Sequence, residues 1–195
     1  MRHLKLIPSK QFKIQTIFTL FTLLLIMILT RGSHLLTSIT LPDASFALFL
    51  IGGMLLKKPK WFISLFAASV IIDLIALSIN PTDQIPINLG YLGLFPSYGI
   101  MWLIGLYVSK TKDILKFAIF SAFGTFVSFM ISTQTYYLLS NKFPGITIQE
   151  SIQTGWEYFP HSFIYTMIYL IAYWGIQSLL KRQFLSQKAT LPFKY

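Results

Sequence analysis

The sequence alternates long apolar runs with short connections, and this alternation limits the possible folds more than any other feature. The apolar runs cover residues 14–30, 44–56, 61–79, 93–108, 114–139 and 161–180. Most of them reach the roughly 17–25 residues that an α-helix needs to cross a bilayer. We therefore predict an all-α, polytopic membrane protein whose six transmembrane helices form a single membrane domain over residues 1–195.

The composition agrees with a membrane protein and excludes an ordinary soluble domain. The chain is 54% hydrophobic and only 11% charged, whereas about a quarter of the residues in a soluble domain are charged. The net charge of +10 does not indicate a nucleic-acid partner, because the Lys and Arg residues form short clusters between apolar runs. The lipid bilayer is the expected partner of most of the surface.

The distribution of basic residues predicts the orientation of the chain. Fourteen of the sixteen Lys and Arg residues lie in the two termini and in the turns after the second and fourth runs, whereas Arg31 and Lys142 lie on the other side. Since cytoplasmic loops are enriched in Lys and Arg, both termini should be cytoplasmic. This arrangement requires an even number of spans and makes the opposite side the outer side.

The second run is short for a transmembrane helix. Residues 44–56 are thirteen in number, and as a helix they would reach only about 20 Å of the roughly 30 Å hydrocarbon core. The helix should therefore begin earlier, lie beside a thinned or water-filled region, or be partly re-entrant. A cavity at its outer end is one of these solutions.

Two aspartates interrupt apolar sequence near the outer side. Asp43 precedes the second run, where its carboxylate could cap the helix or line a site. Asp73 lies inside the third run, where a carboxylate costs roughly 2.5–3.5 kcal/mol on insertion scales, so it should face the bundle interior or a wet cavity. Asp73 either belongs to a binding site or holds the bundle together.

Four more polar side chains are predicted on the same side as these aspartates. They are His34, Asn88, Tyr91 and Tyr98. The neutral imidazole of His34 could ligate a metal, although His34 and His161 do not have the spacing of a zinc site. We expect the six outer groups to converge on one binding site.

Polar and aromatic residues recur every four positions at the entry to the sixth run and along it. They are Glu157, His161, Tyr165, Tyr169 and Tyr173. His161 and Tyr165 are the first members inside the run and could line the same pocket, while the later members pack against other helices. The plainer interpretation is an interfacial belt, since Tyr is enriched at membrane boundaries.

Two further patterns concern helix packing and helix ends. Small residues recur at helical spacing in the fifth run, which is typical of close contact between membrane helices. They are Ser121, Gly124 or Thr125, Ser128 and Ser132. Thr147 and Glu150 have the spacing of a capping box, which predicts the start of a short interfacial helix.

The sequence lacks the common signatures of enzymes. It contains no Walker-type phosphate loop, no Gly-x-Ser-x-Gly and no His-Glu-x-x-His. It also contains no cysteine, which excludes disulfides and thiolate metal sites. We therefore expect neither an enzymatic activity nor a resident cofactor, and any energy input must come from elsewhere.

Several segments spread over most of the chain carry a resemblance to a known family. They are Leu-Pro-Asp-Ala-Ser at residues 41–45, the region of Asp73, residues 86–91, Phe-Pro-Ser-Tyr-Gly at residues 95–99, and Trp102. Together they resemble BtuM, a family of small bacterial inner-membrane proteins implicated in cobalamin uptake. The resemblance implies the bundle of a substrate-binding S-component of an energy-coupling-factor transporter. It also implies binding-site positions at His34, Asp73 and Tyr91.

The chain departs from that family at two points. Pro86 stands where the best-known members have a cysteine that resembles a cobalt ligand and takes part in removing the cyano group of the vitamin. Cysteine-dependent decyanation is therefore not expected, and His34 becomes the candidate axial ligand of the cobalt. The first run also lacks the Ala-x-x-x-Ala pattern by which many S-components dock their transmembrane partner, which leaves the need for an energy-coupling module open.

We therefore expect a carrier of the bacterial inner membrane that binds a corrinoid on the outer side and mediates its uptake. Two alternatives remain open from the sequence. One is an S-component for another vitamin or a modified base. The other is a small membrane-embedded enzyme or assembly factor that uses Asp73 and His161.

Overall fold

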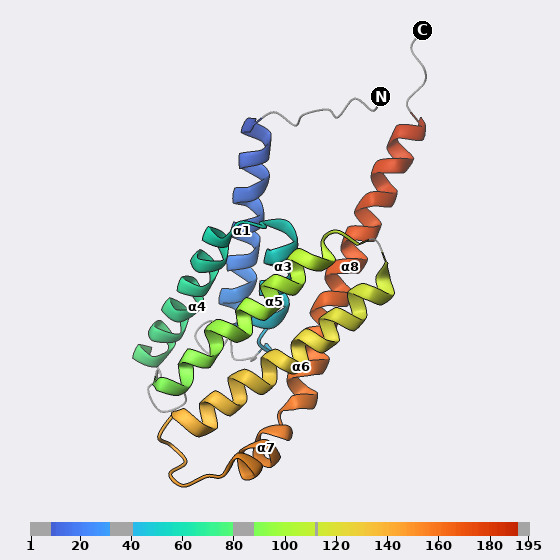
Figure 1. The fold of residues 1–195 in the computed structure, drawn as a ribbon. Helices are drawn as coiled ribbons and strands as arrows, with labels where there is room; N and C mark the ends of the chain where they lie inside the picture. The colour runs from blue at the N-terminus through green and yellow to red at the C-terminus, as the bar shows by residue number, and fades with distance from the viewer. Residues whose placement is uncertain (1–8, 32–40, 80–87, 112, 191–195) are drawn as a thin grey trace.

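The computed structural model describes residues 9–31, 41–79, 88–111 and 113–190, with side chains between residues 13 and 179. Within these ranges all regular secondary structure is helical (Figure 1). The elements are α1 (Ser9–Arg31), α3 (Ser45–Leu55), α4 (Pro59–Ile79), the 3₁₀ helix η1 (Leu89–Gly93), α5 (Leu94–Val108), α6 (Ile114–Leu139), α7 (Ile148–Trp156) and α8 (Phe159–Thr190). The prediction of an all-α protein is confirmed.

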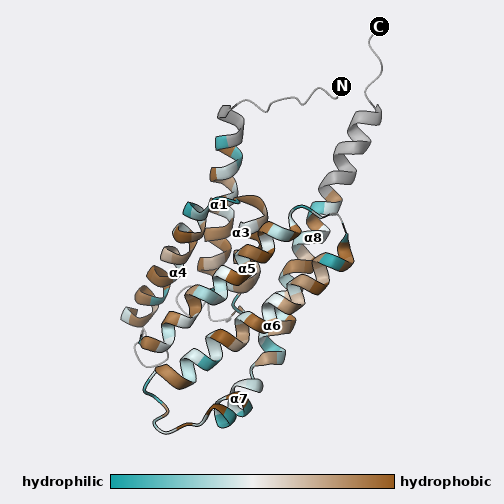
Figure 2. Ribbon diagram, in the orientation of Figure 1, coloured by the Kyte–Doolittle hydropathy of each residue, from teal (hydrophilic) through white to brown (hydrophobic). Residues whose placement is uncertain are grey.

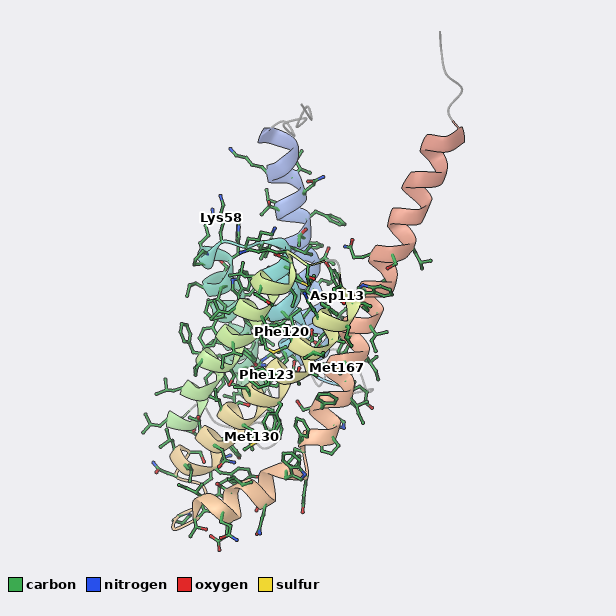
Figure 3. The ribbon with its side chains drawn as sticks, turned by 45° about the vertical axis from the view of Figure 1, so that its right-hand side comes forward. Lys58, Asp113, Phe120, Phe123, Met130 and Met167 are labelled. Carbon is green, nitrogen blue, oxygen red and sulfur yellow. The ribbon has the colours of Figure 1, made fainter. Side chains whose placement is uncertain are left out.

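The long helices form a bundle in which successive helices run in alternate directions. As a result α1 begins and α8 ends at one end of the bundle, while α7 lies at the opposite end (Figure 1). Lys58 and Asp113 lie toward the end at which α1 begins, whereas Met130 lies toward the other end (Figure 3). We call the first the basic end, because the lysines of the turn around Lys58 lie there. We call the second the cluster end, after the cluster of polar side chains described below.

Among the residues that the structure describes, four segments are long and apolar enough to cross a membrane. They are Lys13–Arg31, Pro59–Ile79, Leu89–Val108 and Ile114–Leu139. Hydrophobic residues dominate these helices along most of their length (Figure 2). These apolar helices indicate a multi-pass membrane protein, in agreement with the composition.

The other two predicted spans differ from these four. α3 has only 11 residues, so the structure removes the possibility that this helix begins well before Ala44. α8 is long, but it is not among the four apolar spans that the described residues contain. Residues 44–56 and 161–180 therefore stay predictions as membrane spans.

The short helix α3 is the centre of the bundle and packs most closely on α5. Its residues 47–53 are all buried. Two glycines permit this contact: a Cβ added at Gly53 would overlap the carbonyl oxygen of Trp102, and one added at Gly105 would overlap the carbonyl oxygen of Leu50. The backbones of α3 and α5 therefore touch, with no side chain between them.

The small residues of α6 also serve helix packing, as their spacing predicted. Ser121, Gly124, Thr125 and Ser128 are buried, and Ser132 is partly buried. The Ser128 hydroxyl donates to the carbonyl oxygen of Ser97 in α5 at 2.9 Å. A hydroxyl that bonds a neighbouring helix is one of the contacts that hold helices together in lipid.

Candidate functional site

Six polar side chains from four parts of the chain meet at the end of α1. They are Arg31, Asp43, Ser45, Asp73, Tyr91 and Tyr98. We call this group the Arg31 cluster, because Arg31 contacts five of its members directly or through Asp73. The cluster lies at the end of the bundle where α1 ends and α3 begins, and it gives the cluster end its name.

The strongest contact in the cluster joins Arg31 to Asp73. The Arg31 Nε atom donates to Oδ1 of Asp73 at 2.6 Å, and Nη2 donates to Oδ2 at 2.5 Å. This pairing is bidentate, the geometry in which a guanidinium and a carboxylate form two parallel charge-assisted bonds. The side chains are only 11% and 20% exposed, respectively, so the pair connects α1 to α4 in a largely buried place.

The remaining terminal nitrogen of Arg31 turns toward α3 and α5. Nη1 lies 2.5 Å from the Tyr98 hydroxyl oxygen and 3.0 Å from Oγ of Ser45. It also lies 3.4 Å from Oδ2 of Asp43, which is a long contact for a charged hydrogen bond. One guanidinium thus holds four segments of the chain together.

Asp73 has little capacity left for a further partner. Besides both Arg31 bonds, it accepts a hydrogen bond from the Tyr91 hydroxyl at Oδ2. Asp43 differs, since its side chain is 51% exposed. Its Oδ1 atom accepts from the backbone N–H of Ser45, the first residue of α3, at 2.9 Å. The N-cap position itself is Ala44, which makes no side-chain cap bond.

The charges of the cluster do not cancel. One guanidinium faces two carboxylates, Asp43 and Asp73, so the group carries one excess negative charge when both acids are ionised. The more exposed of the two carboxylates is Asp43. The cluster is therefore better suited to hydrogen-bond donors or cationic groups on a ligand than to an anion.

The cluster is recessed below the end of the bundle. Asp73 lies six residues before the end of α4 at Ile79, which corresponds to about 9 Å along a helix. The short α3 begins at Ser45, next to the Arg31 side chain. The late start of α3 thus leaves the polar groups below the level that α4 reaches.

Aromatic side chains close the cluster toward the middle of the bundle. The buried Tyr98 ring stacks on Phe49 with centroids 4.3 Å apart and meets Phe46 edge-on at 5.9 Å. The guanidinium carbon of Arg31 lies 5.8 Å from the Tyr98 ring centroid, within the range of a cation–π interaction. The polar groups therefore rest on an aromatic layer.

Four of the predicted site residues come together in this cluster. They are Asp43, Asp73, Tyr91 and Tyr98. Asn88 has another task in the structure, since its side-chain oxygen accepts from the N–H of Gly90 at 2.8 Å and caps η1. His34 and Pro86 lie outside the described residues.

The predicted residues of α8 lie apart from these four. The rings of His161 and Tyr165 contact each other with centroids 4.6 Å apart, and among the described residues neither has a hydrogen bond or ring contact with the cluster. α8 approaches the cluster through Tyr169, whose hydroxyl donates to the carbonyl oxygen of Pro42 at 2.8 Å. Sequence reasoning assigned Tyr169 to packing and did not single out this contact.

The central residue of the cluster was missed from the sequence. Arg31 was interpreted only as a charge that reports topology. The available signal was its place: it is one of only two basic residues on the predicted outer side, directly after an apolar run. A basic residue that breaks the charge distribution at the end of a span needs a partner, and Asp73 was the acid available inside a span.

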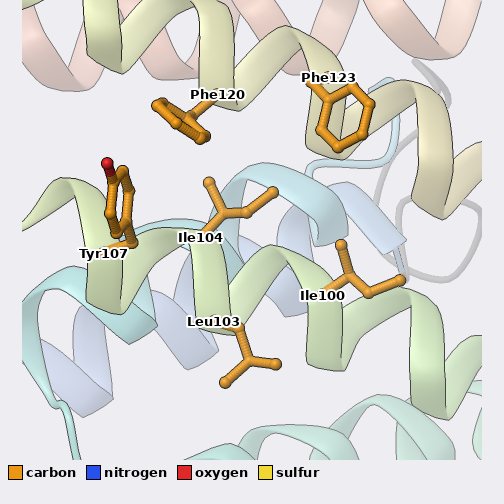
Figure 4. A pocket seen from close by; sticks show the side chains of 6 residues that line it. All are labelled: Ile100, Leu103, Ile104, Tyr107, Phe120 and Phe123. Carbon is orange, nitrogen blue, oxygen red and sulfur yellow. The ribbon is translucent and has the colours of Figure 1, made fainter.

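Neither a metal site nor an apolar groove offers a better place for a polar ligand. Within the ranges that the structure describes, no group of three or more His, Asp or Glu residues gathers to hold a metal ion. A groove of about 300 Å³ lies between α5 and α6 (Figure 4). Its lining is almost entirely apolar: Ile100, Leu103, Ile104, Tyr107, Phe120 and Phe123.

The fold and the cluster together define a class of protein: a helical multi-pass membrane protein with an ion cluster recessed at one end of its bundle. Neither a protein-family model nor a curated protein sequence matches the chain.

Proposed function

We propose that this protein is a carrier that binds a corrinoid, with cobalamin as the leading candidate, and mediates its uptake across the bacterial inner membrane. One observation carries the proposal. Asp73 and Tyr91, two of the positions that the resemblance to BtuM implicates in binding, meet directly at Asp73 Oδ2. The Arg31–Asp73 pair, which shares this carboxylate, lies within apolar helices, where ionisable residues usually mark a functional site.

The cluster offers a division of labour that suits a large ligand with an apolar ring and polar side groups. Ligand sites commonly combine apolar walls with a few polar groups that fix orientation. In this proposal the exposed Asp43 carboxylate accepts hydrogen bonds from ligand amides. Asp73 does not contact the ligand and instead positions Arg31 and Tyr91, because all of its described bonds are already internal.

The proposal includes an orientation and a coupling partner. The cluster end faces the outside and both termini face the cytoplasm, in six spans, as the fourteen-to-two distribution of basic residues favours. Reporter fusions after Leu56 and Val108 should read cytoplasmic, and a fusion near Gln149 should read external. In this proposal an energy-coupling module is a partner of the carrier only if uptake needs an energy input.

The proposal is tested by titrating the purified, detergent-solubilised protein with cyanocobalamin and recording the absorption spectrum. Asp43→Asn should weaken binding about tenfold, equivalent to about 1.4 kcal/mol. The thermal unfolding midpoint should change little, because Asp43 is half exposed and its contact with Arg31 is long. Glu157→Gln is the matched control, because Glu157 is an exposed carboxylate between α7 and α8 at the same end of the bundle. Absence of any cobalamin binding by the wild-type protein would overturn the proposal.

The absence of cysteine gives a second test of the same proposal. Bound cyanocobalamin should keep the spectrum of its cyano form, since the chain offers no thiolate. If His34 is the axial ligand, hydroxocobalamin should bind more weakly below about pH 6, because protonation removes the imidazole lone pair. His34→Ala should abolish this pH dependence, and binding that is independent of pH in the wild type would exclude His34 as the ligand.

A further inference from the structure

The helix α7 connects α6 to α8 at the cluster end of the bundle (Figure 1). It has nine residues and begins with a complete capping box: Thr147 Oγ1 accepts from the backbone N–H of Glu150, and the Glu150 carboxylate accepts from the N–H of Thr147. A helix this short is marginal by itself. Its other contacts must therefore hold it in place.

One face of α7 is fitted to α6. The Ser151 hydroxyl donates to Oε1 of Gln134 at 2.6 Å. Gly155 lies so close to Thr133 that an added Cβ would be 2.5 Å from the Thr133 Cγ2 atom. The small residues Ser151 and Gly155 are both buried, so this face is occupied.

The other face of α7 is apolar and largely exposed. Ile148, Ile152 and Trp156 recur every four residues, and they are 66%, 39% and 49% exposed, respectively. Residues four apart lie on one side of a helix. We call these three side chains the α7 stripe. In water such a row would be unfavourable, since large apolar side chains prefer an apolar surrounding.

The length of α6 indicates at which depth α7 lies. α6 starts at Ile114, just after Asp113 and two residues before Lys116, which marks the membrane boundary at the basic end. A hydrocarbon core of about 30 Å takes about 20 helical residues, and the apolar helix α6 ends at Leu139, so the opposite boundary falls between about Gln134 and Leu139. Because Ser151 bonds Gln134, α7 lies at that boundary.

The α7 stripe is also continuous with the surface of the apolar helices. The Trp156 ring stacks on Phe159 with centroids 4.9 Å apart and meets Phe126 of α6 edge-on at 6.3 Å. Phe126 is itself exposed on a helix long and apolar enough to cross the membrane. The medium that covers Phe126 thus extends to Trp156.

The charge of α7 limits which surface it fits. The helix contains Glu150, is followed by Glu157 and contains no Lys or Arg. Anionic headgroups would repel it, so the attraction must come from the apolar stripe and from the preference of Trp for the membrane interface.

From these observations we infer that the α7 stripe inserts into the lipid–water interface at the cluster end of the bundle. The occupant of this face is a zwitterionic lipid surface. α8 begins three residues after Trp156, so the inserted stripe also fixes the depth of the helix whose Tyr169 bonds Pro42 beside the cluster. This inference does not depend on the nature of the transported ligand.

The test uses the absence of cysteine from the chain. Ile152→Cys is labelled with a nitroxide in phosphatidylcholine vesicles, and its collisions with oxygen, which concentrates in lipid, are compared with those of a water-soluble nickel chelate. The matched control is Gln153→Cys, an exposed position one residue further along the helix. The oxygen-to-nickel ratio should be at least about threefold higher at residue 152 than at residue 153, as expected for an amphipathic interfacial helix.

Three results would overturn the inference. They are equal ratios at the two positions, a higher nickel accessibility at residue 152, and shielding of residue 152 from both reagents, which would mean that protein covers the stripe. Should Ile152→Cys fail to fold, Ile148→Cys with Gln149→Cys as its control gives the same comparison one turn earlier.

Discussion

The Arg31 cluster and the α3–α5 contact hold helices together by opposite means. In the cluster, long charged and polar side chains bond one another across different helices, and bonded residues are up to 67 positions apart in the sequence. In the α3–α5 contact, Gly53 and Gly105 remove the side chains and let the two backbones touch. The first region adds polar groups to an apolar bundle, and the second removes bulk from it.

The difference teaches how each region tolerates change. Lipid tails give helices no hydrophobic reason to associate, so membrane helices depend on close packing and on hydrogen bonds between them. Close packing tolerates no added volume, whereas the largely buried Arg31–Asp73 pair does not tolerate the loss of one partner. Loss of one group should therefore harm the cluster, and gain of one group should harm the contact.

The largest effect is expected from Arg31→Gln. The change leaves the largely buried Asp73 without its cation, and removing one partner of a buried pair costs about 3 kcal/mol or more. Thermal unfolding in detergent, followed by size-exclusion chromatography, measures the loss. The double variant Arg31→Gln/Asp73→Asn should recover part of the stability, and a double variant no more stable than the single one would contradict this account.

Gly105→Ala tests the other region. The new methyl group would overlap the Leu50 carbonyl oxygen, and overpacking of this kind costs about 2 kcal/mol. Gly175→Ala is the control, because no atom lies within 4 Å of its added Cβ. The control should be neutral or stabilising by up to about 1 kcal/mol, and equal losses in both variants would exclude close approach as the cause.

Tyr91→Phe removes one hydroxyl from the cluster and keeps the ring. Asp73 then loses the donor at Oδ2 but keeps both bonds to Arg31. Since a hydrogen bond to a charged group contributes about 1.5 kcal/mol, the unfolding midpoint should fall less than in Arg31→Gln. Tyr107→Phe serves as the control, because Tyr107 is exposed on the apolar groove; a similar fall there would mean that the bond to Asp73 contributes nothing specific.

The smallest effect is expected at Glu150. Its carboxylate accepts hydrogen bonds from Thr147, although the side chain is exposed. The N–H and the hydroxyl of Thr147 stabilise its charged form and hold the pKa of Glu150 below its ordinary value of 4.5. A lowered folded-state pKa contributes stability above the unfolded pKa, and this contribution is lost as pH falls through the folded-state pKa. The start of α7 should therefore loosen only below about pH 4.5.

A nitroxide at Gln149→Cys would report that loosening as increased mobility. Glu150→Gln should make the mobility independent of pH over the same range. Two results would exclude the capping box as the cause. One is high mobility of the Gln149→Cys label already at neutral pH, and the other is the same pH response after Glu150→Gln.

The sequence predicted the apolar helices well, because each is marked by its own residues. The run at 114–139 matches α6 (Ile114–Leu139), and the run at 61–79 differs from α4 by two residues at its start. Helix existence is a local property here, since the bilayer demands about 20 apolar residues in succession.

The site was predicted only in part, because its geometry depends on distant pairings. Counting spans predicts that four of the site residues share one side of the membrane, and these residues do meet in the structure. They are Asp43, Asp73, Tyr91 and Tyr98. That Arg31 is their common partner depends on the axial register of α1 against α4, which no local pattern encodes. For the same reason the sequence could not separate Tyr169, which reaches Pro42, from its neighbours on α8.

The short α3 has a consequence for how this protein responds to its bilayer. A helix of 11 residues would suffer severe hydrophobic mismatch if lipid touched it. α3 instead contacts five longer helices, so lipid meets these helices around it. Membranes of different thickness should then be accommodated by tilting of those outer helices, while the central helix and the polar cluster at its end keep their depth relative to each other.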